Sequence, residues 1–302
     1  MTLAAITRLL LYLGAMIVVG DASLSIGRRW SSATGEDAHG DAHGDARGST
    51  HRGEPRGTDW LVLIGWMLVV CATLALMLLQ ARAMELEPNI ASLTMLVSTT
   101  WGRGWLALIT AALVGVGVTV TRFPTGLRVV AAFCLAGAMG GLGHAAADDA
   151  FPLSARVTDA LHVLGAGAWL GGLSVVAWRQ WRLGSSRQSS AWESFSRMAT
   201  VAAPLVVVTG LVAGWRRLQL APLNQGATTP ISFVAAATSP YGLLLGAKLA
   251  LVLITLALGY KHRRRVLEEH APSWNTVFTE LALAVMVLVV TGVLTGTAPP
   301  GE

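Results

Sequence analysis

Charged side chains are scarce in this sequence. Asp, Glu, Lys and Arg make up 13% of the 302 residues, whereas hydrophobic residues make up 53%. Soluble domains carry charge at about 25% of their positions, so the composition argues against an ordinary soluble enzyme. The net charge of +5 does not point to nucleic acid, because the Arg residues flank apolar runs, as they do in membrane proteins.

Several patterns that mark known chemistry are also missing. The two cysteines, Cys71 and Cys134, lie in separate apolar runs and form no Cys-x-x-Cys pair, so thiol redox chemistry has little support. The stretch Gly246-Ala-Lys248 lies in an apolar run and lacks the Gly-rich loop of a nucleotide site. The His-Glu-x-x-His pattern is absent, and no Ser/His/Asp set lies at one membrane depth. We therefore expect a protein that is not an enzyme.

Long apolar runs dominate what is present. A helix that spans the membrane needs about 20 mostly apolar residues. Eight runs qualify: 3–26, 60–82, 104–121, 127–147, 157–178, 198–216, 241–260 and 275–297. We predict an all-α polytopic membrane protein, an eight-transmembrane-helix bundle that forms a single domain over residues 1–302.

The distribution of Arg and Lys predicts the orientation. The loops after the first, third, fifth and seventh runs carry most of the 22 basic residues: Arg28, Arg29, Arg47, Arg52, Arg56, Arg122, Arg128, Arg179, Arg182, Arg187, Arg197, Lys261, Arg263, Arg264 and Arg265. Cytoplasmic loops carry the excess of positive charge. These loops are therefore expected in the cytoplasm, and both termini on the opposite side.

The loop at 27–59 is unusually long. It contains three near-repeats that begin at Asp37, Asp41 and Asp45, followed by His51. Sequence rich in Gly, Asp and His cannot bury enough apolar area to fold. We expect a disordered cytoplasmic insert between the first two helices.

Two histidines, His144 and His162, lie within predicted spans, on the fourth and fifth helices. The loop between these helices is short, so an antiparallel hairpin would place both imidazoles at similar depth near the outer surface. Asp148 follows His144 by four residues and Asp159 precedes His162 by three, spacings that share a helix face. With Asp149, the hairpin can bring two imidazoles and up to three carboxylates together.

This set of side chains has three interpretations. Imidazole and carboxylate without thiolate suit Cu(II), Zn(II) or Ni(II). A carboxylate can instead accept a hydrogen bond from the second ring nitrogen of a metal-bound histidine and so orient the ring. Two histidines on facing helices could also hold one haem, which we favour less. The simplest alternative is that each histidine only bonds a backbone carbonyl or water. Two Gly-x-x-x-Gly pairs, Gly137/Gly141 and Gly167/Gly171, would let the two helices approach closely.

Lys248, Glu280 and Asp21 are further ionisable residues within predicted spans. Lys248 lies about two turns into the seventh helix from the outside, and Glu280 about two turns into the eighth from the cytoplasm. Charged residues in spans often mark an ion or proton pathway, although a structural hydrogen bond is an equal alternative for each. Asp21 is expected to pair with Arg28, Arg29 or solvent.

Several of these stretches resemble the CopD family of bacterial inner-membrane copper proteins. The resemblance rests on the order and spacing of short motifs: Gly143-His144-Ala145, Leu161-His162 through Trp169-Leu-Gly-Gly-Leu173, Thr209-Gly210, Pro240-Tyr241-Gly242 through Lys248-Leu249, and Glu280-Leu281 running to Pro299-Pro300. It covers most of the chain and is weaker in the second and third helices. The His/Asp-rich insert departs from the family.

The resemblance implies copper uptake or transport across the bacterial inner membrane, with the chain surrounded by membrane lipid. It implies a periplasmic copper-binding protein of the CopC type as a partner, and no nucleic acid. His144 and His162 would then be metal ligands, Asp148, Asp149 and Asp159 auxiliary groups, and Lys248 and Glu280 pathway residues. Two alternatives stay open: a single-haem b-type electron carrier that uses the same histidines, and a membrane factor that delivers or senses copper without transporting it.

Overall fold

The regular structure of the chain is helical, as predicted. A computed structural model describes residues 2–34, 57–87, 89–142, 152–183, 189–220, 233–267 and 273–298. The longer elements are α1 (Leu3–Thr34), α2 (Gly57–Ala83), α4 (Thr100–Val120), α5 (Thr125–Gly140), α6 (Pro152–Ala166), α7 (Gly172–Leu183), α8 (Ser189–Trp215), α11 (Pro240–Leu267) and α12 (Trp274–Leu294). The shorter ones are α3 (Ile90–Ser98), α10 (Phe233–Thr238) and the π-helical turns η3 (Gly167–Gly171) and η5 (Arg216–Leu220).

Seven helices within these ranges are long and apolar enough to cross a membrane. One of them runs continuously from Pro152 to Arg182 through α6, η3 and α7. The predicted span at 127–147 corresponds to the shorter apolar helix α5, so the predicted count of eight is approximate. The prediction of a loop over 27–59 is too wide, because α1 continues to Thr34 and α2 begins at Gly57. The remainder of that insert, 35–56, lies outside the described residues.

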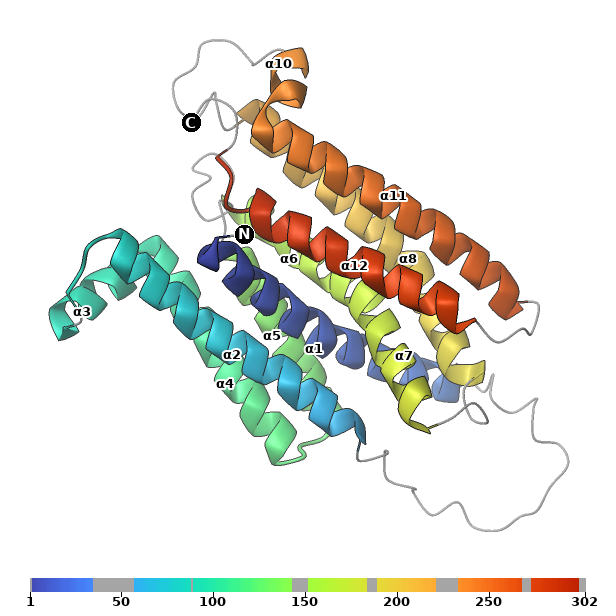
Figure 1. Cartoon of the computed structure of the whole chain (residues 1–302). Coiled ribbons are helices and arrows are strands. Elements are labelled where there is room, and N and C mark those ends of the chain that lie inside the picture. Colours follow the sequence, from blue (N-terminus) through green and yellow to red (C-terminus); the bar gives the residue numbers. More distant parts are fainter. Residues whose placement is uncertain are drawn as a thin grey trace, which may run out of the picture.

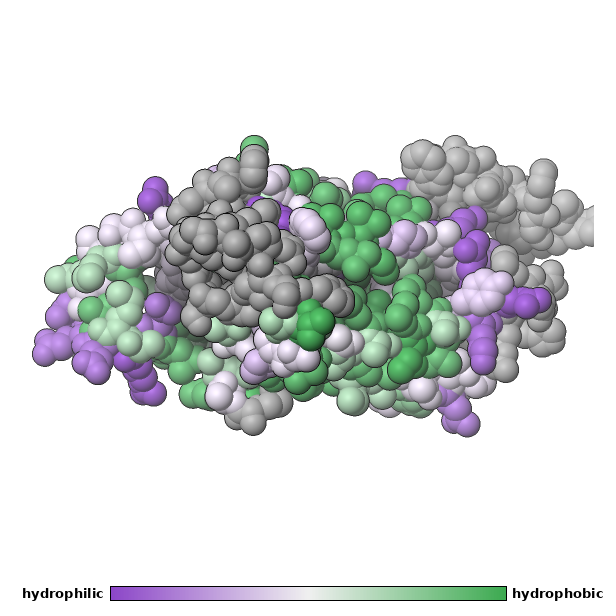
Figure 2. Space-filling model, turned by 90° about the horizontal axis from the view of Figure 1, so that it is seen from above, coloured by the Kyte–Doolittle hydropathy of each residue, from purple (hydrophilic) through white to green (hydrophobic). Residues whose placement is uncertain are grey.

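The helices run along one common direction, so the bundle has two ends. The start of α1 and the end of α12 lie at the same end, together with α3 and α10 (Figure 1). We call this end the terminal face and the opposite end the loop face. Hydrophilic residues gather at both ends, and hydrophobic residues fill the band between them (Figure 2). This distribution is the one that a bilayer selects, since polar side chains are expensive in its hydrocarbon core.

Helix α1 lies between the two large apolar cores of the bundle. One face of α1 contributes Met16 and Leu24 to a core shared with η3, α7, α8 and α12. Another face contributes Leu11, Val18 and Val19 to a core shared with α2, α4 and α5. The first helix therefore holds the two halves of the molecule together.

The closest backbone approach in the bundle joins α1 to η3. A Cβ atom on Gly171 would collide with the Met16 carbonyl group, and one on Gly20 would collide with the Gly171 backbone. A Cβ on Gly167 would lie 2.5 Å from two carbon atoms of Val19. Glycine is required at these positions because the two backbones touch directly.

Gly167 and Gly171 do not form the contact that the sequence predicted, which was between the fourth and fifth predicted helices. Gly167 and Gly171 face α1 rather than α5. On α5, a Cβ added to Gly137 would meet nothing within 4 Å, whereas one on Gly140 would lie 2.5 Å from the Arg156 carbonyl oxygen of α6. The two predicted Gly-x-x-x-Gly pairs are therefore not the contact between these neighbouring helices.

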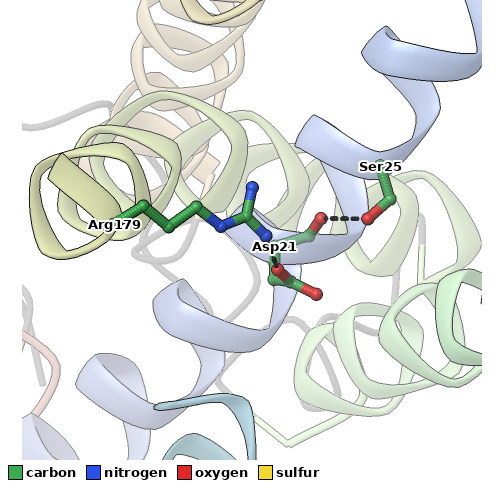
Figure 3. A network of polar contacts seen from close by, with 3 residues as sticks. All are labelled: Asp21, Ser25 and Arg179. Atoms are coloured by element: carbon green, nitrogen blue, oxygen red, sulfur yellow. Dashed lines mark hydrogen bonds and ion pairs between the residues drawn. The ribbon is translucent and has the colours of Figure 1, made fainter. Parts of the chain in front are cut away.

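A buried ion pair reinforces the contact between α1 and the long helix that contains η3. Arg179 on α7 donates to the Asp21 carboxylate at 2.6 Å, and the two side chains are 13% and 10% exposed. Ser25 donates to the Asp21 carbonyl oxygen at 2.9 Å, so the pair lies within a small polar network (Figure 3). The sequence predicted neighbouring arginines or solvent for Asp21 and missed Arg179, which lies 158 positions away.

The contact between α1 and η3 predicts opposite effects for two glycine substitutions. Gly171→Ala would force the backbones of α1 and η3 apart and is expected to lower the free energy of unfolding by at least about 2 kcal/mol. Gly137→Ala, which has open space around it, is expected to leave stability unchanged or raise it by up to about 1 kcal/mol. Thermal unfolding in one detergent compares them; equal stability of both variants would refute the contact.

Candidate functional site

His162 lies deeper in the bundle than the sequence indicated. Because α6 begins at Pro152 rather than near 157, ten residues separate its start from His162, which is about 15 Å along the helix. The predicted span at 157–178 therefore places His162 too shallow by five residues, or about 7.5 Å along the helix. The imidazole lies where α6 crosses α8.

Thr209 of α8 sets the hydrogen bonding of His162. The His162 Nδ1 atom lies 3.0 Å from the Thr209 hydroxyl oxygen. That hydroxyl donates its own proton to the Leu205 carbonyl oxygen at 2.6 Å, so toward His162 it can only accept. In this arrangement the ring proton lies on Nδ1, and Nε2 carries the lone pair that a metal can bind. The imidazole also hydrogen-bonds the backbone of Val206 on α8.

Two glycines let α6 and α8 come close enough for this bond. A Cβ on Gly210 would lie 3.1 Å from His162 Cε1, and a Cβ on Gly165 would lie 2.9 Å from the Val206 side chain. Pro204 lies inside α8 one turn before Thr209, where it removes one backbone hydrogen bond of the helix. Gly210 thus leaves room on α8 for the imidazole, and Gly165 lets the two helices pack closely just beyond it.

Asp159, one turn before His162 on α6, faces several cations. Its carboxylate interacts electrostatically with Arg217, Arg216 and Lys248. Lys248 also acts on His162, so the ammonium group of α11 lies near both side chains. The ligand role of Asp159 stays a prediction. Its cationic neighbours are Arg217 and Arg216, which act on it most strongly, and Lys248.

Two tyrosines extend this polar group to other helices. Tyr12 of α1 hydrogen-bonds the side chain of Thr295 and interacts electrostatically with Asp159 and Arg217. Tyr241 of α11 interacts with the same two charges. The group lies within about 15 Å of the terminal face by helix rise, and we call it the terminal-face cluster. Its members are Tyr12, Asp159, His162, Thr209, Arg216, Arg217, Tyr241 and Lys248.

The other predicted ligands, His144, Asp148 and Asp149, lie outside the described residues. Within the ranges that the structure describes, no group of three or more His, Cys, Asp or Glu side chains is arranged to hold a metal ion. Gly140 of α5 lies level with Arg156 and Ala160, so His162 is about two to six residues deeper than that level. The predicted meeting of His144 with His162 therefore stays a prediction.

Glu280 does not belong to the terminal-face cluster. It is buried at 4% exposure on α12, fourteen residues or about 21 Å before the end of that helix at Leu294. The structure thus places the two predicted pathway residues apart: Lys248 beside Asp159, and Glu280 nearer the loop face.

Sequence reasoning missed the roles of Thr209, Arg217 and Tyr12. The Thr-Gly pair at 209–210 was one of the stretches behind the family resemblance, but nothing in its local pattern indicates that its partner is His162. Arg217 lies just beyond the predicted span at 198–216 and belongs to the π-helical turn η5 that follows α8. Helix packing in a membrane is set by small residues on any face, so the sequence does not specify which helices meet.

Comparison with known proteins supports one assignment. Residues 189–294 match the family model CopD, described as Copper resistance protein D. The match covers α8, α11 and α12, and with them Thr209, Lys248 and Glu280. Neither the curated proteins nor the solved structures contain a match to this chain. Through residues 189–294, about a third of its length, the chain is similar to the CopD family of copper resistance proteins.

Proposed function

We propose that the protein takes up copper at the terminal-face cluster and transports it across the bacterial inner membrane, with His162 as a ligand. Similarity to a copper resistance family and the membrane-spanning helices support the copper-related, multi-pass part of this proposal. The observation that carries the site is the Thr209–His162 bond, because a hydrogen bond to one ring nitrogen orients an imidazole for metal binding through the other.

The remaining ligands are proposed from sequence. Asp159 lies one turn from His162, and His144, Asp148 and Asp149 follow α5. Imidazole and carboxylate ligands together favour Cu(II) over Cu(I). Lys248 and Glu280 are the proposed pathway residues, the first near the entry site and the second buried closer to the loop face.

Lys248 gives the site a way to release its cargo. A divalent cation beside His162 is repelled by the positive charge of Lys248, while the Asp159 carboxylate attracts both cations. Copper and the ammonium group therefore compete for one carboxylate. Repulsion between like charges in a partly buried site is worth a few kcal/mol, enough to prevent copper from being held too tightly for transport.

The proposed orientation places the terminal face in the periplasm. It follows from the excess of Arg and Lys in the connections of the loop face. A periplasmic copper-binding protein of the CopC type would then meet the protein on the side where His162 is closest to the surface.

Copper binding by purified protein tests the proposal. Samples are loaded with Cu(II), desalted and analysed for metal content and by EPR. We expect stoichiometric copper in the wild type, less in His162→Ala and none in the His144→Ala/His162→Ala double variant. A variant with alanine at His39, His43 and His51 is the control and should keep its copper.

Three outcomes would contradict the proposal. Copper that persists in the double variant but is lost from the control would move the site to the insert between α1 and α2. A Soret band in the absorption spectrum of the same protein, at about one haem per chain, would favour the single-haem electron carrier. A copper delivery or sensing factor would bind copper in the same way but would not accumulate it in proteoliposomes.

The bond from Thr209 predicts how substitutions on α8 affect copper. Thr209→Val keeps the shape of the side chain but removes the acceptor, so His162 loses the group that fixes its tautomer and orientation. Loss of such a supporting bond costs about 10–100-fold in metal affinity. Thr209→Ser keeps the hydroxyl and should bind copper nearly as well as the wild type.

Copper titration with a competing chelator measures the three affinities. A matched pair of controls is Thr291→Val and Thr291→Ser, since Thr291 on α12 bonds only a carbonyl of its own helix in the described contacts. Equal copper affinity of Thr209→Val and Thr209→Ser would show that Thr209 does not orient His162 for copper binding.

A further inference from the structure

An apolar groove lies on the opposite half of the bundle from the terminal-face cluster. It has a volume of about 600 Å³ and is bounded by α1, α2, α7 and α12. Its walls include Leu61 of α2, Met16 of α1, Trp178 and Trp181 of α7, and Phe278 and Leu288 of α12. The only polar side chain among its lining residues, apart from the indole groups, is Ser174.

The length of the groove matches one leaflet of a membrane. Its lining on α12 extends from Trp274 to Leu288, fourteen residues or about 21 Å along the helix. Half of a hydrocarbon core about 30 Å thick is about 15 Å. The remaining length of the groove, about 6 Å, therefore reaches the level of the lipid headgroups. The groove therefore extends from the bilayer interior to the interface at the loop face.

Aromatic side chains mark the interfacial end of the groove. Trp178 and Trp181 have ring centroids 5.3 Å apart on α7, and Trp274 and Phe278 have centroids 5.7 Å apart on α12. Trp side chains concentrate at the level of the lipid headgroups, because the ring is apolar and the N–H is polar. The two pairs flank the groove where a headgroup would lie.

A positive charge lies at the same end. The Arg182 guanidinium is 5.4 Å from the centroid of the Trp178 ring, so a cation is stacked on a side chain that lines the groove. The Trp178 Nε1 atom is buried and has no hydrogen-bond partner among the described residues. An apolar slot that ends in a cation and an unused N–H is complementary to an acyl chain that ends in a phosphate.

We propose that this groove binds an anionic phospholipid from the leaflet at the loop face. One acyl chain lies along α12 between α1 and α2, and the phosphate lies beside Arg182. The lipid fills the space between α2 and α12. There it contacts Met16 of α1 and Leu170 of η3, which line the groove. This inference does not depend on the copper proposal, because none of the groove residues belongs to the terminal-face cluster.

Lipid titration of delipidated protein in detergent tests this inference, with binding followed by native mass spectrometry and by thermal stability. Phosphatidylglycerol and phosphatidylcholine of identical chains are compared. We expect the wild type to bind phosphatidylglycerol more tightly and to melt at a higher temperature with it. Arg182→Gln should lose about fivefold in affinity for phosphatidylglycerol, since one basic residue near the headgroups contributes about this much. Lys261→Gln, an exposed cation on α11 at the same face, is the control.

A second variant tests the acyl-chain slot itself. Val285 lines the groove and is 48% exposed, so Val285→Trp should fill the slot without repacking the core and abolish specific lipid binding. Val130→Trp on α5, at a site 56% exposed, is the matched control. Equal binding of the two lipids by the wild type, or unchanged lipid occupancy in Val285→Trp, would overturn the proposal. So would a dimer that forms in the wild type and is lost in Val285→Trp, which would assign the groove to a second copy of the chain.

Discussion

The direct backbone contact between α1 and the η3 turn is the constraint on which the rest of this structure depends. Lipid is as apolar as the helices, so burial alone does not hold them together in a membrane. Close packing must do so, and Gly20, Gly167 and Gly171 provide it. The Asp21–Arg179 pair adds a directional contact between the same two segments. Together they fix the long helix of α6, η3 and α7 against the centre of the bundle, and thereby the height and direction of His162.

The terminal-face cluster combines features that favour a transient cation site. Thr209 orients one imidazole, and a single described carboxylate, Asp159, is shared among Lys248, Arg216 and Arg217. A site with a resident counter-ion binds its cargo less tightly than an unopposed set of carboxylates does. The proposed transport requires such release of copper, whereas a storage site would not.

The sequence predicted the helical membrane fold because span length and hydropathy are local properties. It also identified His162, Asp159 and Lys248 as unusual, since ionisable groups in apolar runs stand out without any structure. It did not predict the partners of these residues. Thr209 and Asp21 have partners far away in sequence, and the Gly-x-x-x-Gly pairs were assigned to the wrong neighbouring helix. The sequence also did not predict the π turn at Gly167–Gly171, because its apolar residues continue the pattern of the surrounding span.

Pulsed EPR of the Cu(II)-loaded protein tests the central claim most directly, because its echo modulation reports the nitrogen of a bound imidazole that faces away from the metal. The account predicts that part of this modulation arises from Nδ1 of His162. The modulation should weaken in His162→Ala, where His144 is the remaining proposed imidazole ligand, and shift in Thr209→Val, where the bond to Nδ1 is missing. It should be unchanged in His270→Ala, because His270 lies between the seventh and eighth predicted spans and is not a proposed ligand. Modulation that is identical in the wild type and in His162→Ala would show that copper binds elsewhere and would contradict the account.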